Sequence, residues 1–184
     1  HIATPQALQE FERDKGFKFV IDKRTNIMHI FKGDVPVKAY RIVRSNYDED
    51  KLQWGDMRTP EGIFPTDVPV KHGKWDIWLT INAAQRAKAD YVKVHGEAAT
   101  KAIAAFEKRY GAISHDSHLK RFNQNKPRDL PPMWNGVGIH GGGNRSNWTH
   151  GCLALGREDA LDLYHRMQGA RATTLILPAQ RERE

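Results

Sequence analysis

The strongest pattern of the chain lies in two segments, Gly138-Ile139-His140-Gly141-Gly142-Gly143 and Thr149-His150-Gly151-Cys152-Leu153. Cys152 is the single cysteine of the chain, and eleven residues (141–151) separate it from His140. A cysteine nucleophile needs a base that helps to form the thiolate. Glycines allow backbone N–H groups to approach a developing oxyanion. The two segments together therefore indicate cysteine acyl transfer.

A single cysteine also has a structural interpretation. Cysteine without a disulfide is among the most buried residue types and often serves as a small hydrophobic side chain. A core strand, however, does not usually read Trp-Thr-His-Gly-Cys (148–152) after the polar loop at 144–147. The spacing therefore favours a catalytic cysteine with a histidine close to it in space.

Three segments in the correct order resemble the L,D-transpeptidase (YkuD-type) catalytic domain. In that family a His-Gly pair precedes Ser/Thr-x-Gly-Cys, as His140-Gly141 precedes residues 149–152 here. Residues 55–64 read G-D-M-R-T-P-E-G-I-F and resemble the family's G-D-x-R-T-P-E-G-x-F segment. Residues 82–87 read N-A-A-Q-R-A and are similar to its N-A-x-D-R-A segment. The resemblance extends from about residue 17 to the last expected strand, near residue 177.

Composition limits the class of protein. A chain of 184 residues, 39% hydrophobic and 28% charged, fits one soluble globular domain, here 1–184. No apolar run reaches membrane-spanning length, so we expect no transmembrane segment, and no signal-peptide pattern begins at His1. The resemblance implies an exported protein of the periplasm or cell envelope, whose signal peptide has been removed or lies outside the given sequence. We expect a monomer.

The charge predicts the kind of partner. A net charge of +7 favours anionic partners, among them cell-wall polymers, anionic lipid and nucleic acid. The basic residues are scattered, and aromatic residues are not interleaved with them as they are in proteins that stack bases. We therefore expect contacts with anionic wall polymer and no nucleic-acid binding.

The hydrophobic periods predict a mainly β, α+β chain. A helix capped by Thr4 is expected to end near residue 15, and a three-stranded antiparallel meander follows over 17–43. Two helical periods over 82–110, one helix after Gly156 and a final strand at 172–177 complete the pattern, and 180–184 reads as a frayed tail. The resemblance implies a mixed-sheet β-sandwich or barrel-like core, with an inserted helical or loop region at about 90–132.

Neither a metal nor a cofactor is expected. His115 and His118, three residues apart, can share a helix face, but no third ligand follows at a fixed spacing. The acidic residues at 48–50 lack the spacing of a calcium-binding loop.

The resemblance assigns the chemistry to named residues. Cys152 is the expected nucleophile and His140 the expected base. The backbone carbonyl of Gly141 would hold the other imidazole nitrogen, which fixes the tautomer without a carboxylate. The N–H groups of Gly151 and Cys152, with His150 or Thr149 nearby, are the expected oxyanion hole.

The resemblance also implies the substrate, a peptidoglycan stem peptide attacked at the L-centre carbonyl of its third residue. Release of the terminal D-amino acid leaves a thioester, which an amine resolves in a 3→3 cross-link or an equivalent attachment. With water as acceptor the same site would act as a hydrolase (carboxypeptidase, endopeptidase or amidase). A non-catalytic wall-binding module is a third hypothesis, disfavoured because both His140 and Cys152 are retained.

One position departs from the family pattern. Many members carry arginine or asparagine two residues after the cysteine, where this chain has Ala154. We expect Asn144, Arg145 or Trp148, in the loop between the two segments, to contact substrate instead, with Thr149. For Trp148, packing is an equal alternative. The identities of the donor and the acceptor are the features that this departure leaves open.

Overall fold

The structure, a computed structural model, describes residues 3–179, and the expected tail at 180–184 lies outside them. The described chain forms two compact units. The sheet unit comprises residues 3–51, 57–81 and 137–179, and the helical unit comprises Leu52–Asp56 and Asn82–Gly136. No helix among the described residues combines the length and the apolar character needed to cross a membrane.

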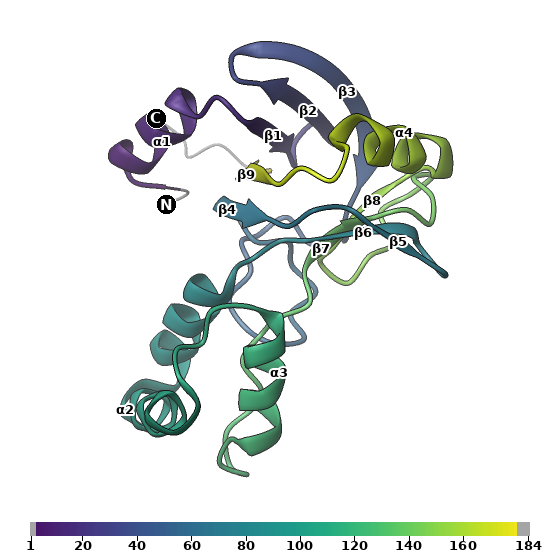
Figure 1. Cartoon of the computed structure of the whole chain (residues 1–184). Coiled ribbons are helices and arrows are strands. Elements are labelled where there is room, and N and C mark those ends of the chain that lie inside the picture. The colour runs from purple at the N-terminus through teal and green to yellow at the C-terminus, as the bar shows by residue number, and fades with distance from the viewer. Residues whose placement is uncertain (1–2, 180–184) are drawn as a thin grey trace. The chain divides into compact units, whose positions relative to one another are not determined.

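The sheet unit is built on one mixed sheet in the order β4-β9-β1-β2-β3-β8-β7-β6-β5 (Figure 1). Its strands are β1 (Phe17–Asp22), β2 (Ile27–Lys32), β3 (Val35–Val43), β4 (Gly62–Thr66), β5 (Val70–His72), β6 (Asp76–Thr80), β7 (Gly138–His140), β8 (Leu153–Leu155) and β9 (Ala172–Leu177). Strands β1, β2 and β3 pair antiparallel, which confirms the predicted meander. The pairs β1–β9 and β7–β8 are parallel.

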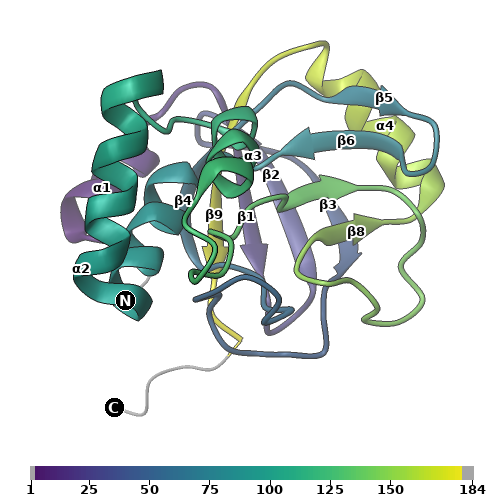
Figure 2. The ribbon, with the colours of Figure 1, turned by 90° about the horizontal axis from the view of Figure 1, so that it is seen from below.

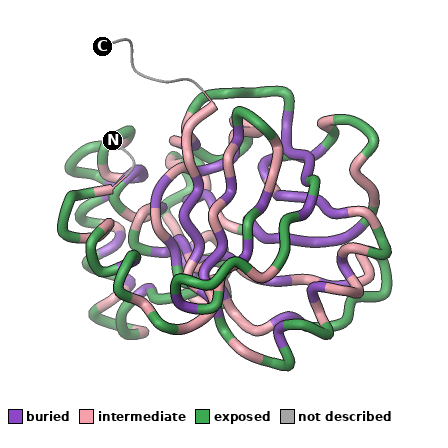
Figure 3. The backbone as a smooth tube through the Cα atoms, turned by 90° about the horizontal axis from the view of Figure 1, so that it is seen from above, coloured by how far each residue is buried: buried purple, intermediate pink, exposed green. Residues whose placement is uncertain are grey.

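Alternation of apolar residues places the core on one face of the meander. Phe19 and Ile21 of β1 lie opposite Ile30 and Met28 of β2, and all four side chains are buried. On the other side of β1, Ile21 pairs with Ile176 of β9, which is also fully buried. In Figure 3, buried purple stretches alternate with half-buried and exposed ones along the backbone. Because every second residue points to the same face, this register fixes which side of the sheet is covered.

The two ends of the sheet approach each other. Thr66, the last residue of β4, forms a bridge with Ile81, just after β6. The N–H of Asp67 donates to the carbonyl of Thr80 at 2.9 Å. Because β4 is at one edge of the sheet and β6 is next to the other edge, these contacts curl the sheet into the predicted barrel-like core.

Two helices pack on the sheet unit, as predicted. Helix α1 (Pro5–Arg13) begins at Thr4, whose hydroxyl accepts a hydrogen bond from the N–H of Ala7 at 3.2 Å, with proline at the first helical position. Helix α4 (Arg157–Met167) follows the second motif segment and contacts β6 (Figure 2).

The helical unit contains α2 (Ala84–Tyr110) and α3 (Asp116–Asn125). The two helices are joined by edge-to-face aromatic contacts of Phe122 with Tyr91 and Phe106. The two predicted helical periods meet at Gly96, whose φ of 63° interrupts the helix. The expected insertion at 90–132 lies inside this unit. Its status as an insertion, and the single-domain assignment of 1–184, remain predictions.

We expect Ile21→Ala to lower the free energy of unfolding by about 2–5 kcal/mol, because it leaves a cavity in the centre of the sheet. Val35→Ala is the matched control: Val35 is also β-branched and lies in a strand, but its side chain is 65% exposed. Its change should stay within about 0.5 kcal/mol. Urea denaturation of the two variants measures both values, and equal losses would contradict the assigned core.

Candidate active site

The pairing of β7 with β8 brings the two motif segments together. Ile139 lies opposite Leu153, and His140 lies opposite Ala154. Cys152 immediately precedes β8, and residues two apart along a strand share a face. Extending β8 by one residue therefore puts the Cys152 side chain on the same face as the His140 side chain, on the adjacent strand. His140 is only 3% exposed, whereas Cys152 is partly exposed.

A backbone hydrogen bond defines the chemical state of the imidazole. Nδ1 of His140 lies 2.5 Å from the carbonyl oxygen of Gly141. A carbonyl oxygen only accepts, so Nδ1 carries the proton and the unprotonated nitrogen of the neutral ring is Nε2. Burial lowers the pKa of His140 below its ordinary 6.5, and His72 contributes in the same direction, while the hydrogen bond to Gly141 opposes them. The ring is therefore neutral at neutral pH and can accept a proton at Nε2.

Gly141 is held where no larger residue fits. Its N–H donates to the carbonyl of Trp75 at 2.8 Å. A Cβ at this position would lie 2.4 Å from that same carbonyl oxygen and 2.7 Å from Oδ2 of Asp76. The absence of a side chain at residue 141 therefore allows the close approach that orients its carbonyl toward His140.

The loop before Cys152 is fixed by threonine hydroxyls. The Thr149 hydroxyl donates to the carbonyl of Cys152 at 2.6 Å and accepts from the N–H of Gly151 at 3.3 Å. Thr59, in the G-D-M-R-T-P-E-G-I-F segment, donates its hydroxyl to the carbonyl of Gly151 at 2.9 Å. Gly151 has a φ of 129°, and a Cβ there would meet the carbonyl oxygen of Arg58 at 2.7 Å. The 55–64 segment thus supports this loop directly.

This hydrogen bonding bears on the expected oxyanion hole. The N–H of Gly151 already has the Thr149 hydroxyl as a partner, so it would have to exchange that partner for an oxyanion. His150 is exposed, and Thr149 is buried beneath the loop. Of the two, His150 is the side chain that substrate can reach without a rearrangement.

The residues expected to contact substrate separate into two groups. Arg145 and Trp148 line an open hollow of about 380 Å³, together with Trp75, Gly142, Gly143 and Ser146. Asn144 instead donates its side-chain amide to the carbonyl of Arg41 at 3.2 Å, which ties the loop to β3. Ala154 is fully buried and therefore contributes no surface to the hollow.

Two tryptophans that line the hollow contact His140, which is buried behind them and does not line the hollow itself. The rings of Trp75 and Trp148 lie 4.8 and 5.7 Å from the imidazole, measured between centroids. Trp75 directly precedes β6. Its contact with His140 depends on sheet pairing between segments far apart in the chain, and no local sequence signal indicates it.

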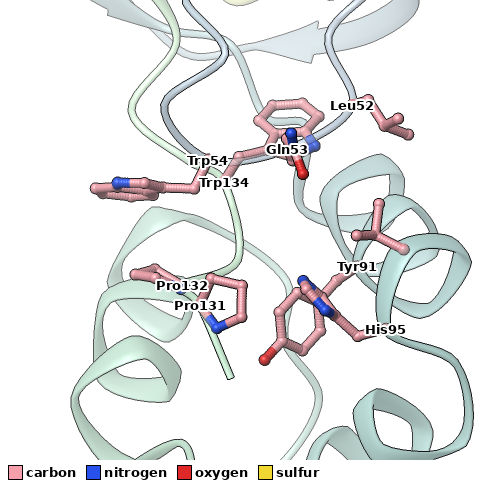
Figure 4. Close-up of a pocket in the computed structure, with 9 residues that line it drawn as sticks. Leu52, Gln53, Trp54, Tyr91, His95, Pro131, Pro132 and Trp134 are labelled. Atoms are coloured by element: carbon pink, nitrogen blue, oxygen red, sulfur yellow. The ribbon is translucent and has the colours of Figure 1, made fainter. Parts of the chain in front are cut away.

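A second hollow lies within the helical unit (Figure 4). Trp54, Tyr91 and Trp134 line it, with residues from 52–53, 94–95 and 131–132. Its cavity volume is about 30 Å³, the space of roughly one water molecule. It cannot hold a peptide, so the hollow beside His140 is the better candidate for a substrate site.

His115 and His118 contact each other, with ring centroids 4.5 Å apart. Nδ1 of His115 bonds the Ser117 hydroxyl, and Nδ1 of His118 bonds the carbonyl of Ala112. The described residues contain no group of three or more metal-binding side chains.

Comparison with known proteins identifies the family. The family model of the L,D-transpeptidase catalytic domain (YkuD) matches residues 17–176, and the chain belongs to this family. No curated protein matches the chain in sequence.

The solved structures of similar fold are distant in sequence. One is the helical cell shape determining protein Pgp2 of Campylobacter jejuni (K307A mutant), with 16% identity, a TM-score of 0.56, and coverage of 93% of this chain and 50% of that chain. Another is an L,D-transpeptidase (residues 123–326) of Xylanimonas cellulosilytica, with 15% identity, a TM-score of 0.46, and coverage of 89% and 61% respectively. The chain thus spans about half the length of the Pgp2 structure.

We expect Gly151→Ala to destabilise the protein by about 1–3 kcal/mol, because the added methyl group meets the Arg58 carbonyl and the φ is unfavourable for alanine. Gly73→Ala is the control, since a Cβ there meets nothing within 4 Å. Thermal unfolding measures both. A Gly151→Ala protein as stable as Gly73→Ala would show that the loop is not packed as described.

The lowered pKa of His140 predicts a pH dependence of stability. Between the ordinary value of 6.5 and the lower folded value, the unfolded chain binds a proton that the folded chain does not. The free energy of unfolding should therefore fall as the pH drops through this window, and be unaffected by this group above it. Denaturation of the wild type and of His140→Gln from about pH 7.5 to pH 5 measures the difference. Equal slopes for the two proteins would contradict it.

Proposed function

We propose that the chain is a cysteine acyltransferase that acts on peptidoglycan stem peptides, with Cys152 as nucleophile and His140 as base. The main observation behind this proposal is the state of the His140 imidazole. Its Nδ1 donates to the Gly141 carbonyl, so that Nε2 is free of a proton and can accept one. The ring lies on β7, the strand that pairs with β8, and Cys152 directly precedes β8. Membership of the L,D-transpeptidase family supports the substrate class.

The first half-reaction forms a thioester. Nε2 of His140 takes the proton of the Cys152 thiol, and the sulfur attacks the carbonyl carbon of the third residue of the stem. The C–N bond to the terminal D-amino acid then breaks, and the imidazolium returns its proton to the departing amine. The products are an acyl-Cys152 thioester and a free D-amino acid.

The second half-reaction regenerates the thiol. An amine from another stem peptide attacks the thioester carbon and gives its proton to His140. The C–S bond breaks, and the Cys152 sulfur regains that proton from the imidazolium. The product is a 3→3 cross-link or an equivalent amide. Both half-reactions need an imidazole that starts neutral, which the lowered pKa of His140 supports.

Stabilisation of the oxyanion comes from the loop that carries the nucleophile. The N–H of Cys152, joined by that of Gly151 when it leaves the Thr149 hydroxyl, would donate to the oxyanion, with His150 nearby. One such preorganised donor is worth about 3 kcal/mol in the transition state. Hydrogen bonds from Thr59 and Thr149 to the loop support this role, because they restrict its movement.

The hollow beside His140 would hold the substrate. Arg145 is exposed there and offers a guanidinium to a stem carboxylate, and Trp148 offers an aromatic surface that is 38% exposed. Thr149 acts through the loop, and Asn144 acts by holding the hollow's rim to β3 rather than by contacting substrate.

Hydrolysis is the second candidate, favoured by the partial exposure of Cys152 itself. Because this side chain is not sealed from solvent, water could approach a thioester on its sulfur. With water as acceptor, the same residues would release the trimmed stem as a carboxypeptidase, endopeptidase or amidase. Under either reaction the protein works as a monomer in the periplasm or cell envelope. Its net charge of +7 favours contact with anionic wall polymer.

We expect a carbapenem to form a covalent adduct with the protein, detected by intact mass, and Cys152→Ala to abolish it. His140→Gln should slow adduct formation by about 100-fold or more, because the thiol loses its base. His29→Gln, an exposed histidine of β2, should leave the rate unchanged. Absence of an adduct on a folded protein whose Cys152 still reacts with iodoacetamide would overturn the proposal and favour a wall-binding module.

Incubation of the protein with purified muropeptides, followed by product analysis, distinguishes transpeptidation from hydrolysis. Accumulation of 3→3 dimers, lost in Cys152→Ala, supports the transferase. Accumulation of trimmed monomers, lost in the same variant, identifies the hydrolase.

A further inference from the structure

Three tryptophan rings surround the imidazole of His140. The ring of Trp78 lies parallel to it, with 5.5 Å between centroids and 5° between planes. Trp75 lies at 4.8 Å with its plane tilted by 37°, and Trp148 lies at 5.7 Å in an edge-on arrangement. Trp75 and Trp148 also contact each other at 5.4 Å. We call the three rings around His140 the aromatic enclosure (Trp75, Trp78 and Trp148). These separations are typical of favourable ring contacts.

The rings of Trp78 and Trp148 make hydrogen bonds that do not involve His140, and Trp75 is held through its backbone. Trp78 lies directly opposite His140 in the pairing of β6 with β7, and its Nε1 donates to the Thr80 hydroxyl at 2.9 Å. Nε1 of Trp148 donates to the Gly143 carbonyl at 3.0 Å. The Trp75 carbonyl accepts from the N–H groups of Gly141 and Ile77. The enclosure is thus preorganised by the sheet and the loop.

The glycines of 138–143 leave room for this enclosure. A Cβ at Gly138 would lie 2.5 Å from Cζ2 of Trp78. A Cβ at Gly142 would lie 2.7 Å from Cε3 of Trp75 and 3.3 Å from Cζ2 of Trp148. The two glycines therefore accept the tryptophan rings against their own backbone. This explains part of the glycine-rich pattern that oxyanion binding alone does not require.

Several ionisable groups lie around the imidazole and its enclosure. They are His72 of β5, Lys74, Asp76, Arg145, Cys152 and Arg157. Asp76 is in an ion pair with Arg157 at 3.5 Å, and the Lys74 ammonium lies over the Trp75 ring, at 4.5 Å from its centroid. The tryptophans thus place apolar surface against the His140 imidazole, in surroundings that otherwise contain several ionisable groups.

We propose that Trp78 is a positioning residue of the reaction: it fixes the plane of the His140 imidazole and, with Trp75 and Trp148, shields that ring from water. The inference rests on the proposed function in assigning the base to His140. A planar partner at 5° restricts rotation about χ2, while the Gly141 carbonyl fixes which nitrogen faces away. Together they direct Nε2 and keep the ring dry, which agrees with burial as the first cause of its lowered pKa.

The test uses Trp78→Leu and Trp78→Phe, with Trp54→Leu as the control. Trp54 is a half-exposed tryptophan of the helical unit, whereas His140 belongs to the sheet unit. The ring protons of His140 are assigned by their loss in His140→Gln and followed by NMR from acid to neutral pH. In the wild type we expect them shifted upfield by the stacked indole, with a pKa below 6.5.

In Trp78→Leu the upfield shift should disappear and the pKa of His140 should rise toward 6.5, because the ring becomes more hydrated. The acidic limb of iodoacetamide alkylation at Cys152 should move up with it. On muropeptides, kcat should fall about tenfold or more with little change in KM, because only the base is misplaced. Trp78→Phe should recover much of the wild-type behaviour, and Trp54→Leu all of it.

Two results would overturn the inference. One is a folded Trp78→Leu protein with an unchanged His140 pKa and alkylation profile. The other, which needs no variant of Trp78, is a wild-type His140 whose ring protons resonate at the positions of an unstacked histidine. Neither readout depends on turnover. A negative result for Trp78 therefore leaves the proposed function standing, and loss of the proposed function leaves the stacking of Trp78 on His140 measurable.

Discussion

The parallel pairing of β7 with β8 is the constraint on which the site depends. It places His140 opposite Ala154 and puts Cys152, one residue before β8, on the face that His140 occupies. Neither residue could reach the other through local chain geometry, because a glycine-rich loop separates them. The pairing is in turn secured at both sides, since β6 pairs with β7 and β3 pairs with β8. The proposed base therefore lies in an internal strand of the sheet and the proposed nucleophile directly precedes another, which restricts the movement of both.

The glycines around His140 and Cys152 have three distinct structural roles. Gly141 approaches the Trp75 carbonyl and turns its own carbonyl toward the imidazole. Gly151 has a backbone conformation that other residues rarely adopt and packs on Arg58. Gly138, with Gly142, accepts a tryptophan ring against its backbone. The glycine-rich motif thus serves close packing around the His140 imidazole. Access of backbone N–H groups to an oxyanion is a second reason for it.

Much of the fold could be predicted from local pattern, and much of the site could not. The meander, the N-terminal helix and the helix after Gly156 follow from alternation, capping and period, which act over a few residues. The parallel contacts of β9 and β8, and the break of α2 at Gly96, depend on tertiary packing. Spacing and the family resemblance selected His140 and Cys152 as the candidate pair, and their roles remain part of the proposal. The stacking of Trp78 on His140 was not predictable, because it arises from strand pairing between distant segments. Asn144 was expected at substrate, but its amide bonds the Arg41 carbonyl.

The most direct measurement of the central claim is the acyl-enzyme itself. The protein would be mixed with a stem tetrapeptide, quenched in acid within the first turnover, and analysed by intact mass and peptide mapping. If Cys152 is the nucleophile, we predict a mass gain equal to the tripeptidyl group, located on Cys152, with release of one terminal D-amino acid. Release of that amino acid without acylation of Cys152, or acylation at another residue, would contradict it.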